Sequence, residues 1–175
     1  LLALNAEGAY VVGIKLAEED ATLALTDLNA NVIARSTVVL GDRDPLSTSR
    51  QLAHGVNALL SDAGVARSRL LGVGVGLAGV IDSQAGICRI SPHNGWREVP
   101  FSRLLEDELN CIVHLDNNVN TLTLVEQLYG VGQQVQNFLV VTVGHGIGLG
   151  IVANGQVVRG ASGGAGEFGH IVVDP

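Results

Sequence analysis

The sequence has 175 residues, of which 47% are hydrophobic and 3% aromatic, so its core must consist mainly of aliphatic side chains. Ten basic residues against 17 acidic ones give a net charge of -7, which disfavours direct binding of nucleic acid by this segment. The longest apolar run, residues 70–81, is too short to cross a membrane, and two cysteines form neither a disulfide framework nor a complete zinc site.

The first half is predicted to begin with strands at residues 10–16, 21–27 and 32–39. The last two form a hairpin through residues 28–31, because Asn and Asp tolerate left-handed backbone. A helix is predicted at 45–63, with Pro45 in its first turn and Gly64 at its end. Strands at 70–76, 86–90 and 111–115, a turn at 82–86 and a helix at 101–109 complete this part.

The second half is predicted to contain a helix at 119–129, ended by Gly130, and strands at 138–143, 148–153 and 156–158. Ten glycines lie between residues 141 and 170, and this change of composition places a lobe boundary near Asp116. We expect an N-terminal lobe at 1–115 and the beginning of a second lobe at 116–175. Strands that first meander and then alternate with helices predict an α/β fold with a mixed sheet and flanking helices.

Residues 74–79 match the G-x-G-x-x-G pattern of dinucleotide-binding proteins. A turn and a strand are predicted after it, whereas a dinucleotide site needs a helix there. We interpret these glycines as permitting close backbone packing, or the approach of a ligand to the strand end. Lys15 is the single lysine and follows no glycine loop, which excludes a P-loop.

The segment Leu115-Asp116-Asn117-Asn118-Val119-Asn120 lies between a predicted strand and a predicted helix. One amide there can cap the helix, but three amides and a carboxylate exceed what one cap needs. Ligands bind at the ends of strands in α/β folds. Amide side chains both donate and accept hydrogen bonds, which suits several hydroxyls of one sugar.

Two glycine-rich stretches follow. Residues 144–150 predict either an ordinary hairpin or a turn whose N–H groups approach an anion. In residues 163–170, Glu167 and His170 lie three apart among glycines, a pattern typical of a ligand or metal site. One histidine cannot hold zinc, and no convincing partners are spaced for it among His54, His93, His114 and Cys88.

The stretch from Gly144 to His170, GHGIGLGIVANGQVVRGASGGAGEFGH, resembles the signature of the ROK family (repressors, open reading frames and sugar kinases). The segments GVGVGLAGVID, SPHNGW and LDNNVN precede it in the family's order. The resemblance implies an actin-like, hexokinase-type (ribonuclease H-like) pair of α/β lobes with a sugar cleft between them. Here the second lobe would be represented by its beginning.

The resemblance also implies the site residues. The implied sugar-binding residues are Gly79, Asn94, Asn117, Asn118, Glu167 and His170. The local alignment also allows His93 in place of Asn94. His170 matches a ligand of the family's structural zinc, whose cysteine ligands would follow Pro175. We therefore expect no cofactor in this segment and a structural zinc in the full-length protein.

The sequence departs from the family's kinases at the positions that the resemblance assigns to phosphate transfer. In the kinases an Asp at the position of Asn118 is the general base, and a neutral amide cannot accept the proton. Lys15 stands where the kinases have an Asp, and Ala17-Glu18 stand where they have glycines that admit phosphate. His145 replaces the usual Thr of a later phosphate turn.

We therefore predict the sugar-sensing effector portion of a ROK transcriptional repressor, which is not an enzyme. The alternative is a glucokinase-like, ATP-dependent sugar kinase of weak activity. Expected partners are a monosaccharide or derivative, operator DNA through a winged helix-turn-helix domain upstream, and further copies in a homodimer or higher oligomer. No membrane partner and a cytoplasmic location are expected. The ends of the sequence lack a starting Met and a closing element, so we expect a longer protein.

Overall fold

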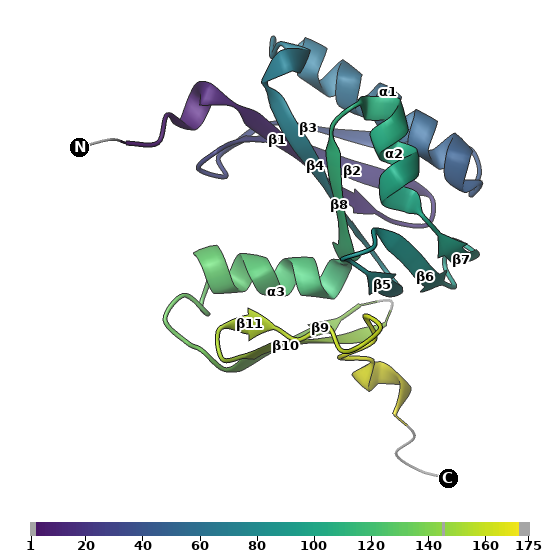
Figure 1. Ribbon diagram of the computed structural model, residues 1–175, viewed down its shortest axis with the longest axis vertical. Helices are drawn as coiled ribbons and strands as arrows, with labels where there is room; N and C mark the ends of the chain where they lie inside the picture. The colour runs from purple at the N-terminus through teal and green to yellow at the C-terminus, as the bar shows by residue number, and fades with distance from the viewer. Residues whose placement is uncertain (1–2, 145, 172–175) are drawn as a thin grey trace. The chain divides into compact units, whose positions relative to one another are not determined.

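The computed structural model describes residues 3–144 and 146–171 (Figure 1). The chain divides into two compact units, Leu1–Asp116 (unit 1) and Asn117–Pro175 (unit 2). Unit 1 contains a five-stranded and a three-stranded sheet with helices, and unit 2 contains a helix against a three-stranded sheet. This confirms the predicted α/β class with a mixed sheet.

The five-stranded sheet of unit 1 has the order β3-β2-β1-β4-β8. Strands β1 (Tyr10–Leu16), β2 (Asp20–Asp27) and β3 (Val32–Val39) form an antiparallel meander, and β4 (Leu70–Leu77) runs parallel to β1. Strand β8 (Ile112–Asn117) lies beside β4. A crossover connection returns the chain to the far side of β1, as a parallel neighbour requires.

The predicted hairpin between β2 and β3 is confirmed, although its left-handed residue differs from the expected one. The Asp27 carboxylate accepts the N–H groups of Asn29 at 2.9 Å and Asn31 at 2.8 Å. Ala30 carries the positive φ of 63°. The aspartate and asparagine side chains therefore shape the turn from its ends, and the strained position falls to alanine.

Two helices cover this sheet: α1 (Pro45–Asp62) and α2 (Phe101–Leu109), which contact each other (Figure 1). The Asp44 side chain caps α1 by accepting the Ser47 N–H at 2.8 Å, Pro45 occupies its first turn, and Gly64 follows its end with φ 67°. These boundaries agree with the predicted helices to within a residue.

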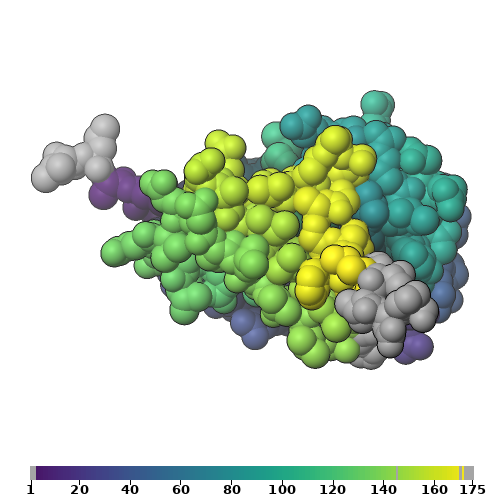
Figure 2. All heavy atoms as spheres, turned by 90° about the horizontal axis from the view of Figure 1, so that it is seen from below, coloured from purple at the N-terminus to yellow at the C-terminus, as the bar shows by residue number. Residues whose placement is uncertain are grey.

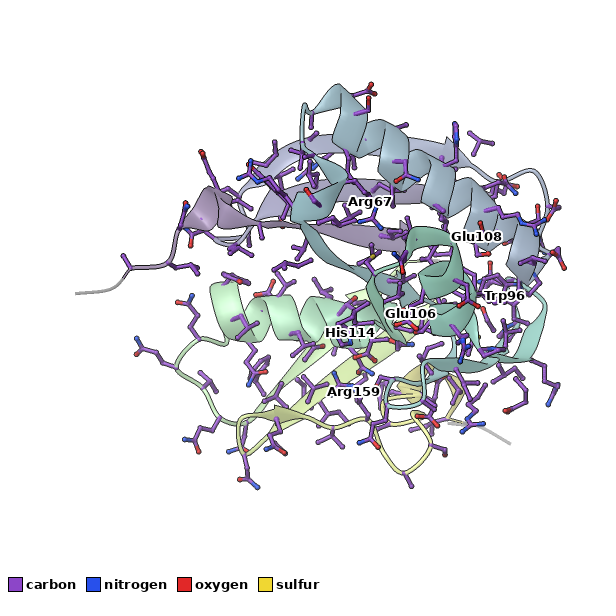
Figure 3. The ribbon with its side chains drawn as sticks, turned by 45° about the horizontal axis from the view of Figure 1, so that its top comes forward. Arg67, Trp96, Glu106, Glu108, His114 and Arg159 are labelled. Atoms are coloured by element: carbon purple, nitrogen blue, oxygen red, sulfur yellow. The ribbon has the colours of Figure 1, made fainter. Side chains whose placement is uncertain are left out.

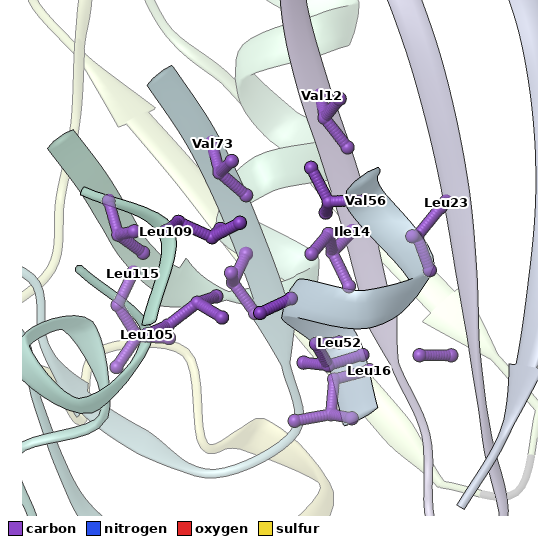
Figure 4. Close-up of a cluster of buried hydrophobic side chains, with 14 of the residues drawn as sticks. Val12, Ile14, Leu16, Leu23, Leu52, Val56, Val73, Leu105, Leu109 and Leu115 are labelled. Carbon is purple, nitrogen blue, oxygen red and sulfur yellow. The ribbon is translucent and has the colours of Figure 1, made fainter. Parts of the chain in front are cut away.

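The core of unit 1 lies between the sheet and these helices (Figure 4). Every second residue of β1 and β2 is buried, which gives the sheet one apolar face. A fully buried aliphatic side chain contributes about 1.5–3 kcal/mol. The labelled core residues are Val12, Ile14, Leu16, Leu23, Leu52, Val56, Val73, Leu105, Leu109 and Leu115.

The three-stranded sheet, β5 (Val80–Asp82), β6 (Ile87–Ser91) and β7 (Trp96–Val99), corrects the prediction in two places. The sequence indicated neither β5 nor β7, whereas the turn that it predicted at 82–86 is present between β5 and β6. Strand β5 is too short to show an alternating pattern, and β7 is polar, with Glu98 at a positive φ of 51°. Arg89 joins the outer strands because it pairs with Asp82 and Glu98, each at 2.6 Å.

Unit 2 consists of α3 (Asn118–Tyr129) against a sheet of order β11-β10-β9, followed by a short 3-10 turn, η3 (Phe168–His170). The strands are β9 (Phe138–Val143), β10 (Ile147–Ala153) and β11 (Gln156–Val157). Gly148 and Gly150 of β10 face α3, where a Cβ would lie 2.5 Å from Val119 Cγ2 and 1.7 Å from Thr123 Oγ1. Two glycines of the 144–150 stretch thus serve the close approach of a helix.

Two further 3-10 turns, η1 (Ala6–Gly8) and η2 (Arg67–Arg69), precede β1 and β4. Among the residues that the structure describes, no helix is long and apolar enough to cross a membrane.

Candidate functional site

Gly79 and Asn94, the two site residues predicted in unit 1, lie close to one another because both contact the end of β6. The Asn94 amide, which is buried, donates to Ser91 Oγ at 2.9 Å. Ser91 Oγ in turn donates to the carbonyl of Ala78 at 2.7 Å. Ser91 therefore ties the turn that carries Asn94 to the turn that carries Gly79.

Gly79 is required by its backbone. Its φ is +137°, and a Cβ there would lie 2.3 Å from the carbonyl oxygen of Ile90. Strand β5 begins directly after it, so no helix follows the G-x-G-x-x-G pattern at this point. The interpretation as close backbone packing is confirmed for Gly79 but not for Gly74, where a Cβ would meet no atom within 4 Å. The strand that follows the pattern excludes a dinucleotide site of this type.

Asn117 and Asn118 lie at the start of α3. The side-chain oxygen Oδ1 of Asn117 caps the helix by accepting the N–H groups of Val119 at 2.7 Å and Asn120 at 3.3 Å. One asparagine of the segment is thus a helix cap, as the sequence predicted. Asn118 is the first helical residue and is half-buried, and within the described residues its side-chain amide makes no hydrogen bond.

The segment that carries Glu167 is packed against β10. A Cβ at Gly166 would lie 1.8 Å from the carbonyl oxygen of Leu149, and one at Gly169 would lie 2.5 Å from that of Ile147. Figure 2 shows this yellow segment directly against the yellow-green strands. The glycines on either side of Glu167 therefore hold an exposed glutamate to the same strand that supports α3.

His145 and His170, which the sequence analysis singled out, are described only in part or not at all. His145 lies outside the described residues. For His170 the backbone belongs to η3, and its side chain lies outside the described part of the chain.

The end of β1 and the turn to β2 hold Lys15, Ala17 and Glu18, which the resemblance aligns with the kinases' phosphate positions. Lys15 points outward from β1, between Thr22 and Gly76 of the neighbouring strands. The Ala17 N–H donates to the carbonyl of Asp20 at 2.9 Å, which closes a tight turn. Glu18 at the tip of this turn forms an ion pair with Arg43.

No group of three or more His, Cys, Asp or Glu side chains that could hold a metal occurs within the described residues. Cys88 is fully buried, and burial, with a smaller contribution from Glu98, raises the pKa of its thiol to about 11. It is therefore neither a nucleophile nor a ready ligand in the folded state. A single histidine does not complete a zinc site.

Sequence reasoning missed three residues at this end of unit 1: Arg43, Ser91 and Trp96. Their partners are main-chain carbonyls or turns far away in the chain, which leave no local pattern. The Trp96 indole, for example, donates to the carbonyl of Arg43 at 2.7 Å across 53 positions. A shallow depression elsewhere on unit 1 is lined by none of the predicted residues; its lining is Arg103, Glu106, Asp107, Asn110, Cys111 and Ile112.

The chain is similar in sequence to known proteins. The sequence profile of the ROK family matches residues 11–175. A putative xylose repressor from Caldicellulosiruptor sp. (strain Rt8B.4) is 31% identical over 180 residues, which cover 99% of this chain and 44% of that protein. A glucokinase from Halalkalibacterium halodurans is 39% identical over 124 residues, or 71% of this chain and 38% of that protein.

Among solved structures, the crystal structure of a ROK family transcriptional regulator, a homologue of the E. coli MLC protein, superimposes with a TM-score of 0.89. It is 26% identical, and the match covers 98% of this chain and 43% of that one. The fold is therefore the actin-like one of the ROK regulators and sugar kinases. The chain spans less than half the length of the curated relatives it matches.

Proposed function

The chain belongs to the ROK family, and on this premise we propose that it is the sugar-sensing portion of a transcriptional repressor. In this proposal it binds a monosaccharide or derivative without phosphorylating it. The observation that carries the proposal is the amide of Asn118 at the first residue of α3. A sugar kinase needs a carboxylate at that position to take the proton of the attacking hydroxyl, and loss of a general base typically costs ~10²–10⁴ in rate.

The turn between β1 and β2 supports the same conclusion. A nucleotide phosphate brought to this turn would meet the Ala17 methyl and the Glu18 carboxylate, and the negative charge opposes an anion. Arg43 is engaged by Glu18 and does not offer an independent positive charge there. The turn is therefore ill suited to ATP.

Recognition chemistry is retained where phosphotransfer chemistry is lost. We assign sugar contacts to Gly79 and Asn94 of unit 1 and to Asn117, Asn118, Glu167 and His170 of unit 2. One N–H of the Asn94 side-chain amide is used by Ser91, so its second N–H and its oxygen Oδ1 are left for a sugar, and Oδ1 is the group that can accept a sugar hydroxyl. His93 is the weaker choice for this contact, since its side chain is 60% exposed.

The remaining parts of the proposal concern the longer protein. Sugar binding favours one conformation, and this changes how paired DNA-binding domains sit on an operator. The repressor names of the relatives support operator DNA as partner. A homodimer or higher oligomer, a cytoplasmic location, and a structural zinc held by His170 with ligands outside this chain belong to the same proposal.

The test uses the full-length protein and three probes suggested by the relatives' names: D-xylose, N-acetyl-D-glucosamine and D-glucose. We expect at least one of them to raise the melting temperature, because a ligand that binds the native state stabilises it. ATP with the same sugar should give no phosphorylated product. Turnover at ordinary enzyme rates, roughly 1–10³ s⁻¹, would refute the proposal.

The second candidate, a weak sugar kinase, is favoured by the 39% identity to the H. halodurans glucokinase. It predicts that slow sugar-dependent ATP consumption accompanies binding. The two candidates therefore differ in product formation and not in sugar affinity.

A further inference from the structure

Three segments meet at the turn that carries Asn94. Arg43, in the loop before α1, pairs with Glu18 of the β1–β2 turn through Nη2. Its Nη1 donates to the main-chain carbonyl of His93 at 3.1 Å. The second Glu18 oxygen lies 4.0 Å from His93 Nδ1. We refer to Glu18, Arg43 and His93 together as the Arg43 clasp.

The main chain of Arg43 is fixed from the other side by Trp96. The Trp96 indole N–H donates to the Arg43 carbonyl at 2.7 Å, and the ring is 4% exposed and packs on Phe101 with centroids 4.6 Å apart. Figure 3 shows Trp96 beside the start of α2. The main chain of Arg43 is thus held by a buried aromatic side chain, and the Arg43 guanidinium extends from there to the turn at residues 92–95.

The clasp does little for the stability of the fold. The side chains of Glu18 and Arg43 are 46% and 51% exposed, and exposed ion pairs contribute little to stability. The clasp acts on a turn that has one main-chain hydrogen bond of its own, 3.2 Å from the Gly95 N–H to the Pro92 carbonyl, besides the bond from the Asn94 side chain to Ser91. A bond from a charged donor to His93 adds a restraint at the middle of that turn.

We propose that Arg43, oriented by Glu18, is a positioning residue for the sugar. It holds residues 92–95 so that the side-chain oxygen Oδ1 of Asn94 is already in place before the sugar binds. This inference rests on the proposed function. A preordered turn spares the ligand the entropy of fixing it, and that saving appears as affinity. In this proposal the Glu18 carboxylate, which opposes phosphate at the β1–β2 turn, supports sugar recognition by orienting Arg43.

The experiment compares four variants of the full-length protein: Arg43→Ala, Arg43→Lys, Glu18→Gln and the control Arg50→Ala. Arg50 forms a similar exposed ion pair, with Glu108 at 3.2 Å, near the end of α2 opposite to Trp96 (Figure 3). The probe is whichever of D-xylose, N-acetyl-D-glucosamine and D-glucose binds the wild type best. We measure its Kd by calorimetry, the melting temperature, and acrylamide quenching of Trp96, whose fluorescence is the part of the emission that Trp96→Phe removes.

We expect Arg43→Ala to raise Kd about three- to tenfold, the range for losing the preorder of a few groups, while Arg50→Ala changes it less than twofold. Arg43→Lys and Glu18→Gln should fall in between, because each keeps part of the clasp. Quenching of Trp96 should increase in Arg43→Ala and not in Arg50→Ala. Both variants should melt within about 2 °C of the wild type.

Two results overturn the inference while leaving the proposed function intact: Kd unchanged in Arg43→Ala, or Kd raised equally in Arg50→Ala. If the wild type binds none of the three sugars, the proposed function fails and the positioning role fails with it. The quenching experiment then still reports whether the clasp orders the turn.

Discussion

Gly150 offers the sharpest test of how the glycine-rich sequence supports α3. An Ala at this position would place its methyl carbon 1.7 Å from Thr123 Oγ1 and 2.9 Å from Thr123 Cβ. Thr123 is fully buried, and its hydroxyl donates to the Val119 carbonyl at 2.7 Å. The side chain therefore has no room to rotate away, and α3 must move off β10.

Overpacking of this kind costs about 1–3 kcal/mol. Gly→Ala in a strand recovers about 0.5–1 kcal/mol through backbone entropy, so the expected net loss lies between about 0 and 2.5 kcal/mol. For a protein of this size the melting temperature should fall by about 2–4 °C per kcal/mol. The matched control is Gly13→Ala in β1, where a Cβ meets no atom within 4 Å and stability should rise slightly.

The assay is urea and thermal unfolding of Gly150→Ala, Gly13→Ala and the double variant Gly150→Ala/Thr123→Ala. Removal of the threonine Oγ1 and Cγ2 should restore at least half of the lost stability, because contacting sites are coupled by about 0.5–3 kcal/mol. Sugar affinity should fall in the single variant, since the displaced helix carries Asn117 and Asn118 in its cap and first turn. The reasoning is refuted if Gly150→Ala is as stable as Gly13→Ala, or if Thr123→Ala gives no recovery.

Three further predictions concern chemistry. Asn118→Asp should fold normally, since an acid in the first helical turn is favoured by about 0.3–1 kcal/mol, and should yield no sugar phosphate; a gain near 10²-fold in a coupled ATP assay would revive the kinase candidate. Cys111, which is partly exposed, should react with a thiol reagent at pH 8 in the native protein, whereas Cys88, whose pKa burial raises to about 11, should react after denaturation; equal rates would contradict this. Hydrogen bonds from a backbone N–H and then from an arginine lower the pKa of Asp82 below its usual 3.8. The stabilisation is therefore present above pH 3.8 and lost as pH falls through the lowered pKa, so Asp82→Asn should flatten the decline of urea midpoints below about pH 4; an unchanged decline would show that this carboxylate is not involved.

Local sequence patterns determined the regular elements of this protein. Alternating burial in β1 and helical spacing in α1 follow from one residue and its near neighbours, so both were predictable. The same holds for the presence of an asparagine cap before α3, because a helix cap bonds to amides two and three positions ahead; the structure identifies it as Asn117. The family and the presence of an amide at Asn118 also stand in the sequence, since each is a matter of residue identity.

Only the tertiary structure showed which residues far apart in the sequence are in contact, and hence the roles of several glycines and of Arg43. It assigned Gly148 and Gly150 to helix packing and Gly79 to a close backbone approach, because a missing Cβ has meaning only when its neighbour is known. It likewise joined Arg43 to Glu18 and to the turn before Trp96, across segments that no periodicity connects. Backbone pattern is a short-range property of the chain, whereas the positioning of a binding side chain depends on packing between residues far apart in it.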